Sequence, residues 1–180
     1  MKTGAANRLP REAGQSSVRD FLTREDYDAY LKRLETGVPL GMAGREEVEG
    51  LVATVRQGLA AGGATKARVA LRGSAVTGRK FDDKAGTYSG RPFDGDPTDP
   101  SDYDLAIVSP EFLEKAKELE VPLAQGGRRT GVLREGDLKR LGLEQLVQGL
   151  KQHGDRDINV MIYGTFKSLR ERGPAMWLDR

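Results

Sequence analysis

The chain has 180 residues, of which 29 are lysine or arginine and 27 are aspartate or glutamate, and its formal net charge is +2. This length predicts one domain with a core of its own, and the slight positive charge permits a nucleotide or nucleic-acid partner without requiring one. The absence of cysteine excludes disulfides and thiolate metal sites, and the absence of an apolar run of about 18 residues argues against a membrane partner.

Two helices are predicted after a polar N-terminal arm. Residues 1–20 show no hydrophobic periodicity, so we expect a flexible arm, and they lack the apolar segment of a secretory signal peptide, which predicts a cytoplasmic protein. Thr23 and Asp26 form a capping-box pattern, and the apolar residues that follow recur at helical spacing up to Gly37. A second helix is predicted over 45–60, where apolar side chains again share one face.

Two strands are predicted on either side of a long loop. An apolar run over 67–72 predicts the first strand, which ends at Gly73-Ser74. The loop, 78–101, is rich in glycine, proline and aspartate, and loops of this length are usually functional or without fixed structure. The second strand is predicted over 102–108.

The second half of the chain predicts helices that alternate with short strands. Ser109 followed by Pro110 is typical of a helix start. The remaining elements are expected as a helix up to Leu119, a short strand over 130–133, a helix over 143–154, a strand over 157–163 and a last short helix capped by Thr165. This alternation favours an α/β (α+β) fold, in which a small mixed β-sheet is flanked by helices and the site lies at the strand ends.

Two aspartates at the start of the second strand are the strongest site candidates. Residues i and i+2 of a strand point to the same face, so Asp102 and Asp104 would converge. Two like charges held this close are unfavourable unless a cation lies between them, and Mg²⁺ is often bound by carboxylates together with substrate phosphates. The preceding residues, 96–101, are rich in turn formers, so the plainer alternative is a turn with solvated acidic side chains.

The Gly73-Ser74 turn is the second candidate. Glycine allows close approach to the backbone and serine offers a hydroxyl, so both residues are predicted to bind the phosphates of a nucleotide. Arg79 and Lys80 follow shortly after and are predicted to neutralise phosphate charge, as is Arg72. The alternatives are a serine that only caps a helix and a basic edge that faces solvent.

A strand, Gly-Ser, a spacer and Asp-x-Asp on a second strand resemble the nucleotidyltransferase superfamily, which has the fold of DNA polymerase β. The resemblance covers about residues 67–163, and the spacer between Ser74 and Asp102 is longer than is usual in the family. Three strings are also similar to the minimal nucleotidyltransferase modules of bacterial toxin-like proteins: 72–78, 90–93 and 101–104.

The resemblance implies a domain plan and a set of ligands. After the arm of residues 1–20, a single nucleotidyltransferase domain is expected over 21–180, with a helical part over 21–62 and a polymerase-β-like core over 63–180. In the family the serine helps to hold the triphosphate of a nucleoside triphosphate such as ATP. Two aspartates bind two Mg²⁺ ions there, together with a third carboxylate from a later strand.

The third carboxylate is the least certain part of the pattern, because the family places an aspartate between apolar residues. In this chain that context surrounds Asn159, and Asp157 lies two residues earlier. The predicted catalytic and metal-binding set is therefore Asp102, Asp104 and Asp157. Asn159 would be a neutral ligand or a hydrogen-bond partner. Alternatively, Asp157 pairs with Arg156 and two carboxylates alone hold the metal.

The resemblance implies a magnesium-dependent enzyme that moves a nucleoside monophosphate from a nucleoside triphosphate to an acceptor hydroxyl and releases pyrophosphate. The end of an RNA, such as a tRNA, is the favoured acceptor, and a protein hydroxyl is the next. The enzyme would be a bacterial toxin acting in the cytosol, as part of a larger secreted effector, with a cognate antitoxin or immunity protein. The alternative is a catalytically inactive nucleotide- or metal-binding module, which Asn159 favours.

Overall fold

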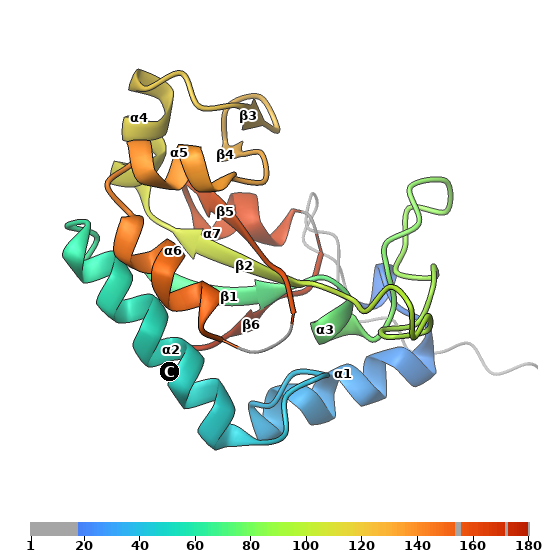
Figure 1. The fold of residues 1–180 in the computed structure, drawn as a ribbon. Coiled ribbons are helices and arrows are strands. Elements are labelled where there is room, and N and C mark those ends of the chain that lie inside the picture. The colour runs from blue at the N-terminus through green and yellow to red at the C-terminus, as the bar shows by residue number, and fades with distance from the viewer. Residues whose placement is uncertain (1–17, 154–155, 172, 180) are drawn as a thin grey trace, which may run out of the picture.

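The computed structural model describes residues 18–153, 156–171 and 173–179. The helices are α1 (Arg24–Thr36), α2 (Arg45–Ala61), α3 (Ser74–Thr77), α4 (Pro110–Glu118), α5 (Glu135–Arg140), α6 (Glu144–Lys151) and α7 (Phe166–Arg170), preceded by a short 3₁₀ turn, η1 (Val18–Asp20). The strands are β1 (Arg68–Arg72), β2 (Tyr103–Val108), β3 (Leu123–Ala124), β4 (Arg129–Thr130), β5 (Ile158–Tyr163) and β6 (Met176–Trp177). Together they form a mixed α/β fold, in which helices flank a six-stranded mixed sheet (Figure 1).

The helix boundaries follow the capping residues that the sequence indicates. The Thr23 hydroxyl accepts a hydrogen bond from the backbone N–H of Asp26 at 3.2 Å, and Gly37 ends α1 in the left-handed conformation. The Ser109 hydroxyl accepts from the N–H of Phe112 at 3.3 Å, so α4 begins at Pro110 as predicted. These helix starts are confirmed.

The sheet has more strands than the sequence predicts. Its order is β3-β4-β5-β2-β1-β6, and β3, β4 and β6 have only two residues each. The short strand expected over 130–133 is confirmed in part, because β4 spans Arg129–Thr130 and Leu133 forms an isolated bridge with Val160. Elements as short as β6 and α5 leave too few residues for a hydrophobic period to be visible.

The pairing of the three long strands determines which residues meet at their ends. Strand β1 runs antiparallel to β2, and β2 runs parallel to β5. In this register Arg72 stands opposite Asp104, and Asp104 stands opposite Asn159. The end of β1 and the starts of β2 and β5 therefore lie at one edge of the sheet.

The two faces of the sheet are covered differently. One face packs against α2, α4 and α6, and its largest fully buried strand residues include Leu71, Leu105 and Ile162. The other face carries a small cluster in which Ala106 and Tyr163 pack with Leu169 of α7. Because strand residues alternate between faces, Arg72, Asp104 and Asn159 belong to this second face.

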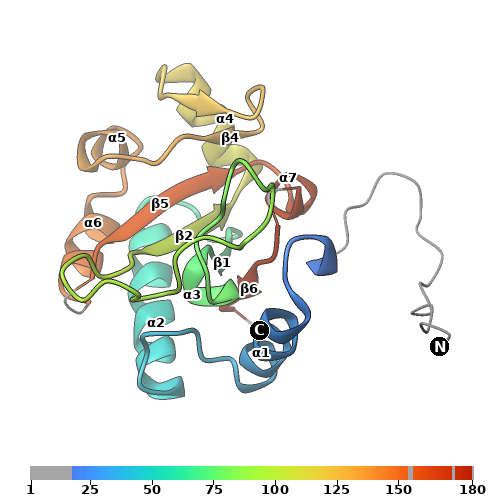
Figure 2. The same ribbon diagram turned by 90° about the vertical axis from the view of Figure 1, so that its right-hand side faces the viewer.

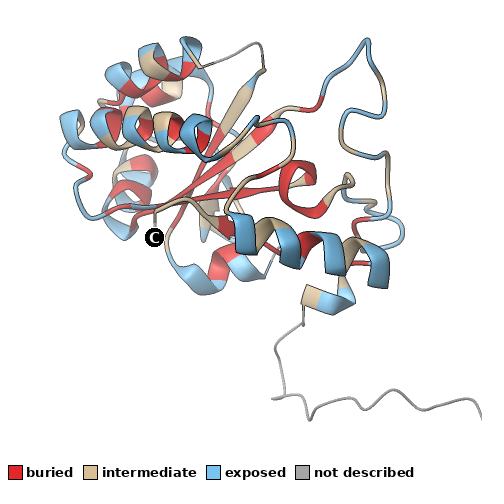
Figure 3. Ribbon diagram, turned by 90° about the horizontal axis from the view of Figure 1, so that it is seen from below, coloured by how far each residue is buried: buried red, intermediate tan, exposed pale blue. Residues whose placement is uncertain are grey.

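The long loop over 78–101 is folded as an irregular hairpin beside the ends of β2 and β5 (Figure 2). Bridges join Arg79 to Pro92 and Asp82 to Thr87. Tyr88 is buried, and its N–H donates to the carbonyl of Phe21 at 2.8 Å. Most of the remaining loop is exposed, in contrast to the buried strands (Figure 3). This segment therefore has a defined structure and forms a wall next to the strand ends.

The expected flexible arm, residues 1–20, lies mostly outside the described residues, since only its last three residues, η1, are placed. Within the described part of the chain, no helix combines the length and apolar character needed to cross a membrane.

Candidate functional site

Two carboxylates and one amide meet at the starts of β2 and β5. The side-chain nitrogen of Asn159 donates to Asp102 Oδ2 at 2.5 Å and to Asp104 Oδ1 at 3.2 Å. Because both oxygens contact one nitrogen, the two carboxylates lie close together, as their i, i+2 spacing on a strand predicts. Asn159 is the residue that joins them, and it belongs to the strand expected to supply the third ligand.

Asp157 takes a different place from the other predicted metal ligands. It immediately precedes β5, its backbone carbonyl accepts a hydrogen bond from the N–H of Tyr103 at 2.9 Å, and the residue is exposed. Among the residues that the structure describes, no three aspartate, glutamate, histidine or cysteine side chains gather into a metal site. The structure therefore brings together Asp102, Asp104 and Asn159, and Asp157 does not join them.

The Gly73-Ser74 turn touches this group from the neighbouring strand. Gly73 has φ of +73°, a conformation that side chains rarely adopt, and a Cβ atom built on it would collide with Asp104 Oδ2. Ser74 begins α3 and is buried, and the Thr77 hydroxyl donates to the carbonyl of Gly73 at 3.1 Å. Glycine at position 73 thus allows the turn to approach the carboxylates directly.

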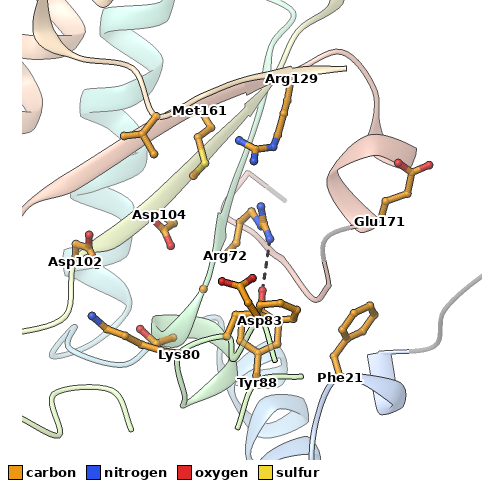
Figure 4. A pocket seen from close by; sticks show the side chains of 14 residues that line it. Phe21, Arg72, Lys80, Asp83, Tyr88, Asp102, Asp104, Arg129, Met161 and Glu171 are labelled. Carbon is orange, nitrogen blue, oxygen red and sulfur yellow. Dashed lines mark hydrogen bonds between the residues drawn. The ribbon is translucent and has the colours of Figure 1, made fainter. Parts of the chain in front are cut away.

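These residues line one cavity of about 570 Å³. Gly73, Ser74, Lys80, Asp102 and Asp104 all contribute to its wall, so these predicted site residues share one space. The other lining residues are Phe21, Arg72, Phe81, Asp83, Tyr88, Arg129, Val132, Met161 and Glu171. Figure 4 shows Asp102, Asp104 and Lys80 near one end of the cavity, and Phe21 and Glu171 toward the other.

Arg72 and Arg129 supply positive charge to the middle of the cavity (Figure 4). Arg72 is 9% exposed and donates hydrogen bonds to the hydroxyls of Tyr163 and Tyr88, the latter at 3.4 Å. The guanidinium carbons of Arg72 and Arg129 lie 5.7 Å and 5.9 Å from the centroid of the Tyr163 ring. A buried cation held by neutral hydroxyls suits an anionic ligand.

Arg79, which was predicted to bind nucleotide, is engaged elsewhere in the structure. Its Nε lies 3.3 Å from Asp26 Oδ2 of α1, and its Nη1 donates to the carbonyl of Gly90 at 3.5 Å. It is not among the described residues that line the cavity. Of the two basic residues after the turn, only Lys80 lines the cavity that holds the two carboxylates.

The electrostatic environment of Asp104 favours a bound cation. Burial raises the pKa of its carboxyl above the ordinary value, and the neighbouring charge of Asp102 acts in the same direction. The hydrogen bond from Asn159 and the charges of Arg72 and Lys80 oppose this rise. An ionised Asp104 is therefore unfavourable in the protein alone, and a divalent cation between the two carboxylates would relieve that cost.

Sequence reasoning missed two contributors to the site. Tyr88 was part of a loop without any hydrophobic period, and Arg129 belongs to a stretch, 126–129, whose two glycines indicate a turn. Both residues belong to segments whose position depends on contacts with distant parts of the chain, Tyr88 with Phe21 and β4 with β5. The available signal for Tyr88 was the presence of three aromatic residues, Phe81, Tyr88 and Phe93, in a loop rich in glycine, proline and aspartate.

The donor set fits one hard divalent cation. Asp102 and Asp104 offer carboxylate oxygens, and Asn159 would offer its amide oxygen after rotation of the side chain. The adjoining turn and cations suit phosphate groups. No family model matches the chain, and neither a similar curated protein nor a similar solved structure was found.

Proposed function

We propose that this chain is a magnesium-dependent nucleotidyltransferase with a polymerase-β-like core. One observation carries the proposal: the Gly73-Ser74 turn at the end of β1 contacts Asp104, beside Asp102, inside a cavity that also holds Lys80. The antiparallel pairing of β1 with β2 and the parallel pairing of β2 with β5 support it, because they bring turn, carboxylates and Asn159 to one sheet edge.

Each residue of the site has a defined role in this proposal. Asp102 and Asp104, with the amide oxygen of Asn159, would hold Mg²⁺. The metal would neutralise phosphate charge and make the acceptor hydroxyl more acidic. Ser74 and the backbone of Gly73 would bind the non-transferred phosphates, and Lys80 would balance their charge.

The reaction exchanges one phosphorus–oxygen bond for another. The acceptor oxygen would bond to the α-phosphorus, the bond from that phosphorus to the oxygen bridging the α- and β-phosphates would break, and pyrophosphate would leave while the hydroxyl proton passes to solvent. Positioning and charge neutralisation by the site supply the catalysis in such transfers. The end of an RNA such as a tRNA is the favoured acceptor, with a protein hydroxyl second. The enzyme would act in the cytosol as a bacterial toxin, for which a cognate immunity protein is expected.

A second function, an inactive module that binds nucleotide or metal without transfer, is favoured by one observation. Asn159 lies opposite Asp104, in the position where the family resemblance implies a third carboxylate. An amide cannot supply the negative charge of that carboxylate, so a second Mg²⁺ would be held less strongly. The two functions differ in whether the protein transfers a nucleoside monophosphate to an acceptor.

The test incubates the protein with each α-labelled nucleoside triphosphate, Mg²⁺ and a whole-cell extract. Wild type should label RNA or protein, and the doubly substituted Asp102→Asn/Asp104→Asn variant should not. Asp99→Asn is the matched control, because Asp99 pairs with Arg91 on the exposed loop, 2.9 Å away. If wild type binds nucleotide without transferring label, the inactive module is favoured. If wild type neither binds nucleotide nor transfers label, both the transferase and a nucleotide-binding module are contradicted.

A further inference from the structure

The cavity has an aromatic wall that the proposed chemistry does not use. Phe21, Phe81 and Tyr88 line it, together with the carboxylates and cations described above. Figure 4 shows Tyr88 below Arg72, and Phe21 farther from Asp102 than either residue. The cavity therefore joins the carboxylates of Asp102 and Asp104 to an aromatic wall, beside which Asp83 and Glu171 also contribute carboxylates.

The aromatic wall keeps an apolar ring accessible beside polar groups. Phe81 is 39% exposed, whereas Tyr88 is 3% exposed. Their ring centroids lie 5.1 Å apart in an edge-to-face arrangement, with 74° between the ring planes. Phe81 thus lines the cavity with a partly exposed ring that packs against the buried ring of Tyr88.

The wall is held in place from two directions. The N–H of Tyr88 donates to the carbonyl of Phe21 at 2.8 Å, and its hydroxyl accepts from Arg72 at 3.4 Å (Figure 4). Next to it, the N–H of Asp82 donates to the carbonyl of Thr87 at 2.8 Å and closes the hairpin turn that directly follows Phe81. A binding surface fixed before its ligand arrives loses little entropy on binding.

We propose that Phe81, supported by Tyr88, is a stacking platform for a nucleobase. The proposal rests on the proposed function only for the identity of the ligand, a nucleotide. A ligand that reaches both the cations and this wall would be anionic at one end and would present a flat π face at the other, which describes a nucleobase joined to phosphate. Stacking on a ring accepts every base, so the platform predicts weak discrimination among the four nucleotides.

Two sources could supply this base, the donor nucleoside triphosphate or the terminal nucleotide of an RNA acceptor. Binding to the wild-type protein is measured by calorimetry in Mg²⁺ with three probes: ATP, inorganic tripolyphosphate and a short oligoribonucleotide. The same titrations are made with Phe81→Ala, with Phe81→Leu, which keeps apolar bulk without a π face, and with Phe81→Trp, which restores one.

A matched control is available in the same chain. Phe166 is 45% exposed and packs edge-to-face on Trp177, with centroids 4.9 Å apart and 79° between the planes. It is not one of the described residues that line the cavity. Phe166→Ala therefore removes an equivalent exposed ring, and it should leave all three affinities unchanged.

Phe81→Ala should weaken ATP binding roughly tenfold, as loss of one base–aromatic stack does, and leave tripolyphosphate binding unchanged. Phe81→Leu should behave like the alanine variant, and Phe81→Trp like wild type. A loss confined to the oligoribonucleotide supports the platform and assigns it to the acceptor. Equal binding of both base-containing probes by wild type and Phe81→Ala overturns the platform, as does a wild type that binds neither.

These outcomes are independent of the transfer assay. Phe81-dependent binding of ATP without any transfer of label would refute the transferase and leave the platform standing. Transfer of label that proceeds with unchanged nucleotide and RNA affinity in Phe81→Ala would leave the transferase standing and refute the platform.

Discussion

Asn159 faces Asp104 across the parallel pair β2–β5, and its amide nitrogen also lies 2.5 Å from Asp102 Oδ2. A single NH₂ group thus donates to two carboxylates that would otherwise repel each other. In the structure this neutral amide offsets the repulsion between the two carboxylates. The same position would hold a third acid in the family that the sequence resembles.

Replacing this amide by a third acid should make stability depend on metal. We expect Asn159→Asp to lower the free energy of unfolding by about 1–3 kcal/mol in a chelator, because three carboxylates would meet without a donor. Mg²⁺ should restore the free energy of unfolding to near the wild-type value. Thermal unfolding with EDTA and with Mg²⁺ measures both effects, and Asp157→Asn, at an exposed residue, is the control. A variant as stable as wild type in EDTA would contradict the role assigned to Asn159.

Stability of the metal-free protein should depend on the ionisation of Asp104. Burial raises the pKa of this carboxyl in the folded protein above its unfolded value. The stabilisation from its protonated form is complete below the unfolded pKa and is lost as the pH rises through the folded pKa. Asp104→Asn should therefore be more stable than wild type at neutral pH, and the difference should shrink as the pH falls toward about 4. Urea unfolding in EDTA across this pH range gives the answer, and a difference that is constant with pH would refute it.

Because Gly73 lies so close to Asp104, we expect that no side chain can be added at position 73. Gly73→Ala should destabilise the fold by about 1–3 kcal/mol and abolish transfer, because the new Cβ is strained at φ of +73° and collides with Asp104. Gly86 has φ of +68° with nothing within 4 Å of its Cβ position, so Gly86→Ala bears the backbone strain alone. Chemical denaturation of both variants separates the cost of backbone strain from the cost of the collision with Asp104. Equal losses of unfolding free energy in the two variants would show that the collision is unimportant.

Arg156 is predicted to position Asp102 through the loop that precedes it. Its guanidinium donates to both carboxylate oxygens of Asp94 and, at 2.7 Å, to the carbonyl of Ser101. Asp94 in turn accepts from the N–H of Ser101 at 2.9 Å. The residue next to Asp102 is therefore held from two sides.

Arg156→Lys should weaken Mg²⁺ binding several-fold and lower transfer, because an ammonium group cannot reproduce the two-pronged contact. Calorimetric titration with Mg²⁺ measures the first effect and labelled nucleotide the second. Arg91→Lys is the matched control, since Arg91 pairs with Asp96 and Asp99 on the outside of the same loop. If both variants bind Mg²⁺ as wild type does, Arg156 has no positioning role.

Local features of this protein were predictable from sequence because their causes lie within a few residues. The hydroxyls of Thr23 and Ser109 cap helices that begin one residue later, and Gly37 ends one. The alternation of side chains along a strand requires Asp102 and Asp104 to share a face. The mixed α/β class and the flanking helices follow from the same short-range periodicities.

The composition of the site was decided by tertiary structure. The register of β2 against β5 brings Asn159, and not Asp157, to the two carboxylates, and a register depends on how the whole sheet packs. Folding of the long loop turns Arg79 toward Asp26 and places Tyr88 under Arg72. Such pairings join residues far apart in the chain, and their energies depend on burial and distance that no local pattern encodes.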